Sequence, residues 1–400
     1  MEKLASLSQR VTVDDLVALA ERASGLLTRL RSSTLRPDQR KHPPRFTGAQ
    51  VQQMLGLSKA TFQRRLEGGK FPAGERVNAS KRLFSVKDVR EMFRTDEHPL
   101  LRPEGEEAAI VTVPNFKGGV SKTTTVATLG QYLALRGHNV LMIDLDPQGT
   151  LTMLMGLLPD TDLSSDDTAL PALIGDEATI DRVIRETYWP GLDLVPAAVG
   201  LSEAEFFLPA QQARDPQFRF YEMLEKALVN ARKHYDVILC DTAPALSYTT
   251  LNGIMCADGL IVPLPPAAPD FASSTQFFRI FTDIAKHFAE KLGAKREFSF
   301  VNVLLTRVDS QDPTLQAMRT LIADAYGKLM MPVQVPRTVA TKAAAIDFGT
   351  VYDIERYEGS AKTIARARSA YDEANALVEQ SIAGVWAQRR SDREVRNGTP

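Results

Sequence analysis

Apolar side chains recur every three or four residues in the first regular stretch of the chain, residues 12–30 (TVDDLVALAERASGLLTRL). This spacing places them on one face of an α-helix: Leu16, Leu19, Ala23, Leu26 and Leu30. Thr12 is the expected N-cap, with Asp15 at the third helical position. Because a lone helix of this length is marginally stable in water, we expect its apolar stripe to pack either on its own domain or on a second copy of the chain.

A second stretch with its own pattern spans residues 46–94. It begins with a helical pattern that ends near Leu55, followed by a turn through Gly56 and a second helix whose N-cap is Ser58. Two helices that meet at a glycine in this way are typical of a helix-turn-helix. A short hairpin-like segment and a third helix, capped by Ser85, complete the stretch.

Polar and basic side chains gather on the second of these helices and on the hairpin: Ser58, Lys59, Thr61, Arg64, Arg65, Lys81 and Arg82. A basic second helix beside a basic wing is typical of a domain that reads a DNA groove and binds phosphates. The phrases FTGAQVQQMLGLSKATFQRR and RLFSVKDV resemble winged helix-turn-helix domains of the MerR-like kind, which favours DNA binding over a small helical interaction module. The basic stretch at 29–45 is either a solvated linker or an arm that contacts the DNA backbone.

Beyond residue 107, apolar runs alternate with helical patterns. Six runs are expected to be buried strands: AIVTVPNF, NVLMIDLD, LDLVPA, YDVILCDTAP, DGLIVPL and FSFVNVLLTRVD. Strands separated by helices form a parallel sheet with helices on both faces, so the expected fold class is a doubly wound, mostly parallel α/β domain. The predicted boundaries are 1–45 for the leading helix and linker, 46–100 for the winged helix-turn-helix domain, and 101–400 for the α/β domain with its C-terminal helix.

The segment VPNFKGGVSKTTT, residues 113–125, connects the first of these strands to a helix that begins near Lys122. The simple phosphate-loop pattern is not met, because Phe116 and Ser121 occupy its two glycine positions. The context still predicts an anion site, since backbone N–H groups and a helix N-terminus face one point. We expect Lys122 to contact the β- and γ-phosphates and the Thr123 hydroxyl to bind Mg²⁺. The predicted nucleotide-binding residues are Lys117, Gly118, Gly119, Val120, Ser121, Lys122, Thr123 and Thr124.

Three aspartates stand at the ends of two predicted strands. Asp144 and Asp146 close NVLMIDLD, and residues two apart on a strand face the same side, so both carboxylates can face the loop. Asp241 closes YDVILCD, where a carboxylate can hold Mg²⁺ through water. Each aspartate alone could instead be a turn or cap residue, but ligands bind at this edge of doubly wound sheets. The expected metal-binding residues are therefore Thr123, Asp144 and Asp241.

Composition limits the class of protein and the compartment in which it is expected. With 44% hydrophobic and 24% charged residues among 400, the chain can bury a large core and is expected to be soluble and globular. A net charge of -1 argues against a uniformly basic coat, so any DNA contact must come from local patches. Two cysteines argue against a disulfide scaffold and suit a reducing cytosol, and no apolar run is long enough to span a bilayer. We expect a cytoplasmic protein with no membrane partner.

Taken together, KGGVSKTT, IDLDPQG and ILCDTAPALSYTTLNGIMCADGLIVP resemble the deviant Walker A ATPases, and among them the ParA-type partition ATPases. The leading helix and winged domain extend the resemblance to the long, DNA-binding subclass. It implies an Mg²⁺-dependent ATPase that forms a homodimer on ATP, binds DNA nonspecifically at the nucleoid, and is stimulated by a ParB-type centromere-binding partner. The implied role is segregation of a plasmid or chromosome, with repression of its own operon through the winged domain.

The resemblance also implies roles for single residues. Lys117 would reach across a nucleotide-sandwich dimer to the phosphates bound by the other subunit, whereas Lys122 would grip phosphate in its own subunit. Serine occurs at the position of Ser121 in the long subclass. The remaining implied roles are orientation of the attacking water by Asp146 and Mg²⁺ binding by Thr123 and Asp241, with Asp144 in support.

Three other protein classes share features with this sequence. A nucleotide-responsive transcription regulator without a segregation role is the alternative function, although a pure sensor needs no water-positioning carboxylate such as Asp146. A nitrogenase-reductase-like protein needs two cysteines for an iron–sulfur cluster, but Cys240 lies inside a predicted strand, which favours a core thiol. A MinD-like protein would end in an amphipathic membrane helix, and SIAGVWAQRRSDREV has little sustained apolar face.

Three basic residues of the C-terminal helix either bind DNA phosphates or form a solvated face: Lys362, Arg366 and Arg368.

Overall fold

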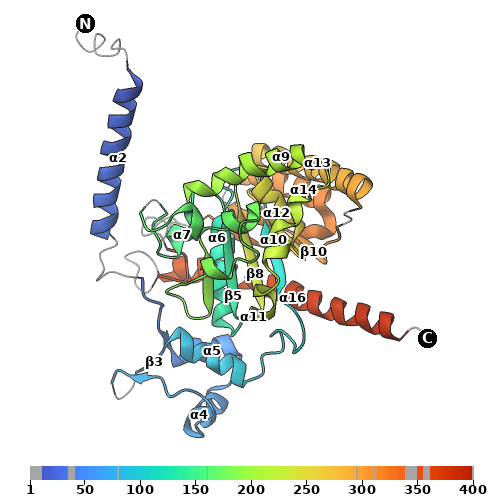
Figure 1. Ribbon diagram of the computed structural model, residues 1–400. Helices are drawn as coiled ribbons and strands as arrows, with labels where there is room; N and C mark the ends of the chain where they lie inside the picture. Colours follow the sequence, from blue (N-terminus) through green and yellow to red (C-terminus); the bar gives the residue numbers. More distant parts are fainter. Residues whose placement is uncertain are drawn as a thin grey trace. The chain divides into compact units, whose positions relative to one another are not determined.

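The structure is a computed structural model that describes residues 11–34, 41–78, 81–159, 161–293, 296–309, 312–337, 349–354 and 361–398. The chain divides into two compact units, Met1–His42 and Pro43–Pro400 (Figure 1). The predicted boundary near residue 45 falls close to this division. Residues 35–40 of the predicted basic linker lie outside the described residues.

The first unit contains α2 (Val13–Thr34), drawn in dark blue in Figure 1. Its predicted N-terminus is confirmed, because Asp15 Oδ2 accepts a hydrogen bond from Thr12 N at 2.8 Å and Asp15 N donates to Thr12 Oγ1 at 3.2 Å. Leu16, Leu19 and Leu26 of the predicted apolar stripe are exposed, and the side chain of Leu30 lies outside the described residues.

The second unit begins with a small module, residues 46–95. Its elements are β1 (Phe46–Thr47), α3 (Gly48–Leu55), α4 (Lys59–Glu67), β2 (Glu75–Arg76), β3 (Arg82–Phe84) and α5 (Val86–Thr95). The strands form an antiparallel sheet in the order β1-β3-β2. The predicted helices are confirmed, as are the turn at Gly56 and the N-caps Ser58 and Ser85. The backbone of Gly56 is left-handed, with φ 64°. The buried core of the module is aromatic and aliphatic, with Phe46, Val51, Phe62, Phe71 and Phe84.

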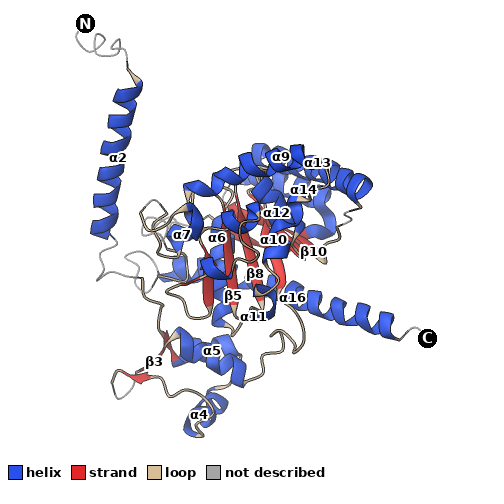
Figure 2. Ribbon diagram, in the orientation of Figure 1, coloured by secondary structure: helices blue, strands red, loops and turns tan. Residues whose placement is uncertain are grey.

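The rest of the second unit is built on an eight-stranded sheet, red in Figure 2. Its order is β11-β10-β9-β4-β8-β5-β7-β6, and all pairs are parallel except β6 with β7. The six predicted strands are confirmed as β4 (Ala109–Val113), β5 (Val140–Leu145), β7 (Leu192–Val195), β8 (Val237–Thr242), β9 (Gly259–Leu264) and β10 (Phe300–Val308). The structure adds β6 (Arg185–Glu186) and β11 (Met330–Pro336).

Successive residues of each strand point to opposite faces of the sheet, and each face is covered by its own helices. Val111 of β4 joins the core beneath α6 (Lys122–Leu135) and α16 (Ala361–Asn397). Its neighbour Ile110 joins the core beneath α12 (Tyr248–Met255) and α13 (Ala268–Leu292). Cys240 lies in that second core, fully buried, as predicted. The predicted doubly wound α/β fold is therefore confirmed.

The other α-helices of this domain are α7 (Thr150–Leu154), α8 (Leu170–Ile174), α9 (Ala204–Arg214), α10 (Met223–Ala227), α11 (Ala231–His234) and α14 (Pro313–Tyr326). Within the described part of the chain, no helix combines the length and apolar character needed to cross a bilayer.

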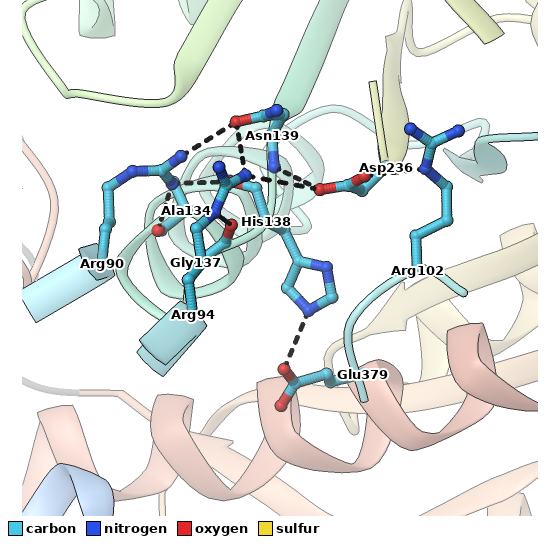
Figure 3. Close-up of polar contacts among 9 residues, drawn as sticks. All are labelled: Arg90, Arg94, Arg102, Ala134, Gly137, His138, Asn139, Asp236 and Glu379. Carbon is cyan, nitrogen blue, oxygen red and sulfur yellow. Dashed lines mark hydrogen bonds and ion pairs between the residues drawn. The ribbon is translucent and has the colours of Figure 1, made fainter. Parts of the chain in front are cut away.

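Helix α5 of the small module is held against the C-terminal end of α6 by a buried arginine. Arg90 donates from Nη1 to the carbonyls of Ala134 and His138, the latter at 2.6 Å, and from Nη2 to Asn139 Oδ1 at 3.0 Å (Figure 3). The last carbonyls of a helix have no partner within the helix itself. Arg90 therefore acts as a C-terminal cap of α6 supplied by another part of the chain.

A second arginine one turn along α5 strengthens this contact. Arg94 donates to the Gly137 carbonyl at 2.7 Å and to Asn139 Oδ1 at 2.9 Å. Asn139 N in turn donates to Asp236 Oδ2 at 2.7 Å, and Arg102 Nε donates to Asp236 Oδ1 at 2.8 Å. As Figure 3 shows, these side chains converge on the turn that follows α6. The small module is thus fastened to the helix whose other end begins at the predicted phosphate loop.

The buried carboxylate of Glu379 on α16 contacts side chains at the C-terminal end of α6 and after α5. His98 Nε2 and His138 Nε2 lie 2.8 and 3.0 Å from Glu379 Oε1, and Arg136 Nε lies 2.9 Å from Glu379 Oε2. Burial alone would raise the pKa of Glu379, but the hydrogen bonds from His138 and His98 and the charge of Arg136 outweigh it and lower this pKa to about 2. Glu379 is therefore ionised at neutral pH.

Candidate nucleotide site

The predicted loop lies between the end of β4 and the start of α6, at the carboxyl edge of the sheet. Gly119 has a left-handed backbone with φ 74°, and so has Ser121, the residue before the helix, with φ 80°. At Gly118 an added Cβ would meet no atom closer than the Pro244 Cβ at 4.0 Å. This is an open turn before a helix N-terminus, the geometry in which successive N–H groups can surround an anion.

A cavity of about 500 Å³ opens at this loop. Most of the predicted nucleotide-binding residues line it, together with Asp146: Gly118, Gly119, Ser121, Lys122, Thr123 and Thr124. Val120 is buried instead, and Lys117 does not line the cavity. The opposite wall is partly apolar and includes Pro336, Val351 and Tyr371. The volume and the mixture of apolar and convergent polar walls are those of a small-molecule site.

Lys122 and Thr123 line the cavity, and Asp241, which is fully buried and does not line it, interacts with both of them. Burial lowers the pKa of Lys122, against the opposing effect of Asp241 and Asp146. Burial and the charge of Asp144 raise the pKa of Asp241 well above its usual range, although the Thr123 hydroxyl and the Lys122 charge lower it. Among the described residues, Asp241 Oδ2 finds no hydrogen-bond partner. A buried carboxylate oxygen without a partner is costly, and a cation held beside Thr123 would satisfy it.

The two aspartates of β5 and its following turn are placed differently from each other. Asp144 is fully buried, with Oδ2 accepting from Thr152 N at 2.9 Å and from Thr152 Oγ1 at 2.8 Å. Its Oδ1 accepts from Asp146 N at 3.1 Å, and burial raises the pKa of Asp144 to about 7. Asp146 is half-buried, lines the cavity and accepts from Gln148 N at 3.0 Å. Asp144 therefore supports the turn, while Asp146 faces the space where a ligand can lie.

Lys117, the other lysine of the loop, forms an ion pair outside the cavity. Its Nζ lies 2.9 Å from Asp270 Oδ1, in the first turn of α13. The Lys117 backbone N–H donates to Asn115 Oδ1 at 3.1 Å, and its carbonyl accepts from Lys122 Nζ at 3.2 Å. The two lysine side chains thus lie in different surroundings, one within the cavity and one paired with Asp270.

The predicted DNA-contacting residues divide into two groups. Three of them have structural partners, namely Ser58, Thr61 and Arg65. Ser58 caps α4 by accepting a hydrogen bond from Thr61 N at 3.2 Å, and its hydroxyl also donates to Thr61 Oγ1 at 2.9 Å. Arg65 pairs with Asp96 and stacks 5.3 Å above the Phe71 ring.

The other four predicted residues lie on α4 and at the hairpin. Lys59, Arg64 and Lys81 are exposed, whereas Arg82 is half-buried on β3. The exposed three are the ones whose charge is available to a phosphate backbone. In the C-terminal helix, Arg368 donates to Tyr352 O at 3.2 Å and so contributes to packing.

The sequence assigned no individual role to two arginines of the cavity. Arg307 and Arg337 both line it, from the ends of β10 and β11. Arg307 has a left-handed backbone with φ 54°. For Arg307 a signal was present, because it lies near the end of the predicted strand FSFVNVLLTRVD, at the carboxyl edge of the sheet where ligands bind in this fold class. The strand that precedes Arg337 was not predicted.

Comparison with known proteins places the chain among relatives of similar length. The family described as AAA domain matches residues 108–294. A putative replication protein A from Rhizobium rhizogenes is 30% identical over 395 residues, which cover 93% of this chain and 96% of the relative. Protein SopA from Escherichia coli strain K12 is 30% identical over 331 residues, which cover 79% of this chain and 82% of SopA.

Solved structures share the fold of this chain. A partition protein shares the fold over 93% of this chain and 98% of its own, with a TM-score of 0.66 and 20% identity. Cobyrinic acid a,c-diamide synthase from Mycobacterium smegmatis, solved with ADP and magnesium, covers 68% of this chain and 94% of its own, with a TM-score of 0.52 and 28% identity. Plasmid partition protein A from Escherichia coli is 26% identical over 325 residues, which cover 76% of this chain and 78% of that protein. These relatives show that the chain belongs to the ParA-like family of partition ATPases.

Proposed function

We propose that this protein partitions DNA by a cycle of ATP-driven dimerisation and Mg²⁺-dependent hydrolysis. The observation that carries the proposal is the separation of the two loop lysines. Lys122 lies within the cavity beside Asp241, and Lys117 lies outside it, paired with Asp270. A lysine that binds the nucleotide of its own subunit is expected inside the cavity. A lysine that contacts the nucleotide of a second subunit is expected outside the cavity, where its side chain can extend toward that subunit.

The residues of the cavity divide the chemical work. Lys122 and the loop N–H groups bind the β- and γ-phosphates and offset their charge. Thr123 and the neighbouring buried Asp241 would hold Mg²⁺, which would neutralise charge on the phosphate oxygens. Asp146, which faces the cavity, orients the attacking water, and Lys117 of a second subunit adds positive charge where negative charge develops in the transition state.

DNA and a protein partner complete the proposal. The small module acts as a winged helix-turn-helix that binds a specific operator through exposed Lys59, Arg64 and Lys81. The ATP-bound dimer binds DNA nonspecifically, which places the protein on the nucleoid, and a ParB-type protein stimulates hydrolysis and release. Repression of its own operon follows from operator binding.

Two single substitutions test the division between the lysines. Lys122→Ala is expected to abolish binding of a fluorescent ATP analogue, whereas Lys117→Ala retains binding by the monomer and loses ATP-dependent dimerisation and turnover. Titration on monomers gives the affinity, and light scattering with ATP gives the dimer. Equal loss of nucleotide affinity in both variants would refute the separate roles.

A second function is favoured by the exposed basic side chains of the small module, namely a nucleotide-responsive regulator of transcription without segregation. Asp146→Ala separates the two. A partition ATPase loses hydrolysis, keeps ATP affinity and stays on nonspecific DNA after an ATP chase. A regulator that uses ATP only as a ligand shows no turnover to lose, and its operator footprint responds to ATP as before.

A further inference from the structure

The end of strand β10 touches the phosphate loop at two successive residues. Thr306 Oγ1 donates to the Val120 carbonyl at 2.9 Å, and Arg307 Nη1 donates to the Gly119 carbonyl. These partners lie 186 and 188 residues apart in sequence. The loop is thus anchored from a strand that contributes nothing to the phosphate-loop motif itself.

Anchoring the carbonyls has a consequence for the N–H groups. The C=O and N–H of one trans peptide point in opposite directions. When Arg307 and Thr306 hold the carbonyls of Gly119 and Val120, the N–H groups of Val120 and Ser121 are turned away from β10. An anion-binding loop requires N–H groups with a fixed direction and carbonyls engaged elsewhere. The two bonds therefore preserve the loop shape that binds phosphate.

The backbone of Arg307 is an independent observation. Its φ of 54° lies in the left-handed region, which is uncommon for a residue with a long side chain. Such strain persists only where the surrounding structure maintains it, and it gathers at binding sites. Glycine would adopt this φ without strain but would supply no guanidinium to the loop.

The charge of Arg307 is available to a ligand. The side chain is exposed and lines the cavity, and within the described parts of the chain its guanidinium has no carboxylate partner. Its recorded hydrogen bond is to a neutral carbonyl, that of Gly119. Lys122 and Arg337 line the same cavity, so the site is rich in positive charge that a polyphosphate complements.

We propose that Arg307 is a positioning residue of the nucleotide site, which fixes the phosphate loop through the Gly119 carbonyl, with Thr306 as its neighbour in the same role. The inference rests on the proposed ATP site and adds to it a residue outside the motif. Arg307 fixes the loop conformation that binds phosphate. Its loss is therefore expected to lower nucleotide affinity more than the rate of the chemical step.

Four variants test the proposal by titration with fluorescent ATP and by steady-state hydrolysis. Arg307→Ala is expected to weaken ATP binding about tenfold, the effect of losing one hydrogen bond from a charged group, while kcat at saturating ATP changes much less. Arg307→Lys should recover part of the affinity. Arg307→Gly relieves the backbone strain and should bind as weakly as Arg307→Ala. Thr306→Val, which keeps the shape and removes the hydroxyl, should weaken binding by about threefold.

The outcomes separate this inference from the proposed function. Lys122→Ala is measured in parallel and must lose ATP binding. If it binds ATP like the wild type, the cavity is not the nucleotide site and both proposals fall. If only the Arg307 variants keep wild-type affinity, the ATP site stands and the positioning role is wrong. If Arg307→Gly binds ATP like the wild type, the side chain is not needed and the inference is overturned as well.

Discussion

Replacing Arg90 by alanine is expected to loosen the small module from the α/β domain. Arg90 is 9% exposed, and its guanidinium donates to the carbonyls of Ala134 and His138 and to Asn139 Oδ1. Alanine supplies none of these donors. The carbonyls at the C-terminal end of α6 then lose a partner in a place shielded from water, which is the costly way to break a hydrogen bond.

The size of the effect follows from two opposing contributions. Hydrogen bonds from a charged donor contribute about 2 kcal/mol each, or about 6 kcal/mol for three. Burial lowers the pKa of Arg90 from 12.5 to about 10, with a smaller effect in the same direction from the charge of Arg94. The lowered pKa shows that burial of the charged guanidinium is costly, so the net contribution lies well below the sum of three average bonds. We therefore expect Arg90→Ala to lower the free energy of unfolding by about 3 kcal/mol.

Hydrogen exchange and urea unfolding measure this prediction. Amides of α5 and of the last turn of α6 should exchange about 100-fold faster in Arg90→Ala, since a tenfold change corresponds to about 1.4 kcal/mol. Lys87→Ala is the matched control, because Lys87 is exposed on the same helix. If Arg90→Ala unfolds at the same urea concentration as Lys87→Ala and the end of α6 keeps its protection, the argument from the buried hydrogen bonds is wrong.

Three further outcomes are expected. Arg64→Ala should weaken binding to DNA from upstream of the gene about tenfold and leave the melting temperature unchanged. Arg65→Ala breaks the packed ion pair with Asp96 and should lower the melting temperature. Identical behaviour of the two variants would contradict the assignment of Arg64 to DNA binding and Arg65 to packing. Asp270→Asn should release Lys117 and let the ATP-bound dimer form, by light scattering, at about threefold lower protein concentration; an equal effect in the Lys117→Ala background would contradict the release. The pKa of Glu379 falls from 4.5 to about 2 on folding, so its charge adds about 3 kcal/mol of stability above pH 4.5 that is lost as the pH falls through 2. Urea unfolding should therefore show Glu379→Gln less stable than the wild type at pH 7, and the difference should narrow below pH 4.5; a constant difference from pH 7 to pH 3 would contradict this.

The sheet could be predicted where its strands are buried on both faces. Six apolar runs became β4, β5, β7, β8, β9 and β10, because central parallel strands are continuously apolar. β11 was missed because it pairs only with β10 at an edge and contains Pro332 and Pro336, which weaken a strand pattern. β6 is two residues long, too short for any periodicity to reveal.

The site could be predicted as far as its motif extends along the chain. The loop residues and Asp146 meet at one cavity because strand ends of a parallel sheet lie at one edge. The position of Asp144 in the sequence did not show that its carboxylate accepts hydrogen bonds from Thr152. No local sequence pattern predicted the ion pair between Lys117 and Asp270. Arg90 lies in a sequence that favours an exposed helix, DVREMFR, and its burial depends on α6. Such contacts depend on packing between distant segments, which periodicity does not encode.

Helix α6 joins the two regions that these experiments perturb. It begins at Lys122, ends beneath Arg90, and has 12 of its 14 residues buried. A helix packed on nearly all sides shifts as a body, since close-packed interiors transmit displacement. If ATP moves α6, the arginine contacts at its far end must be weaker or stronger in the ATP state, and Arg90→Ala must then change ATP affinity by the factor with which ATP changes docking. An unchanged ATP affinity in a variant whose module has demonstrably loosened would mean that the helix stays in place when the nucleotide binds.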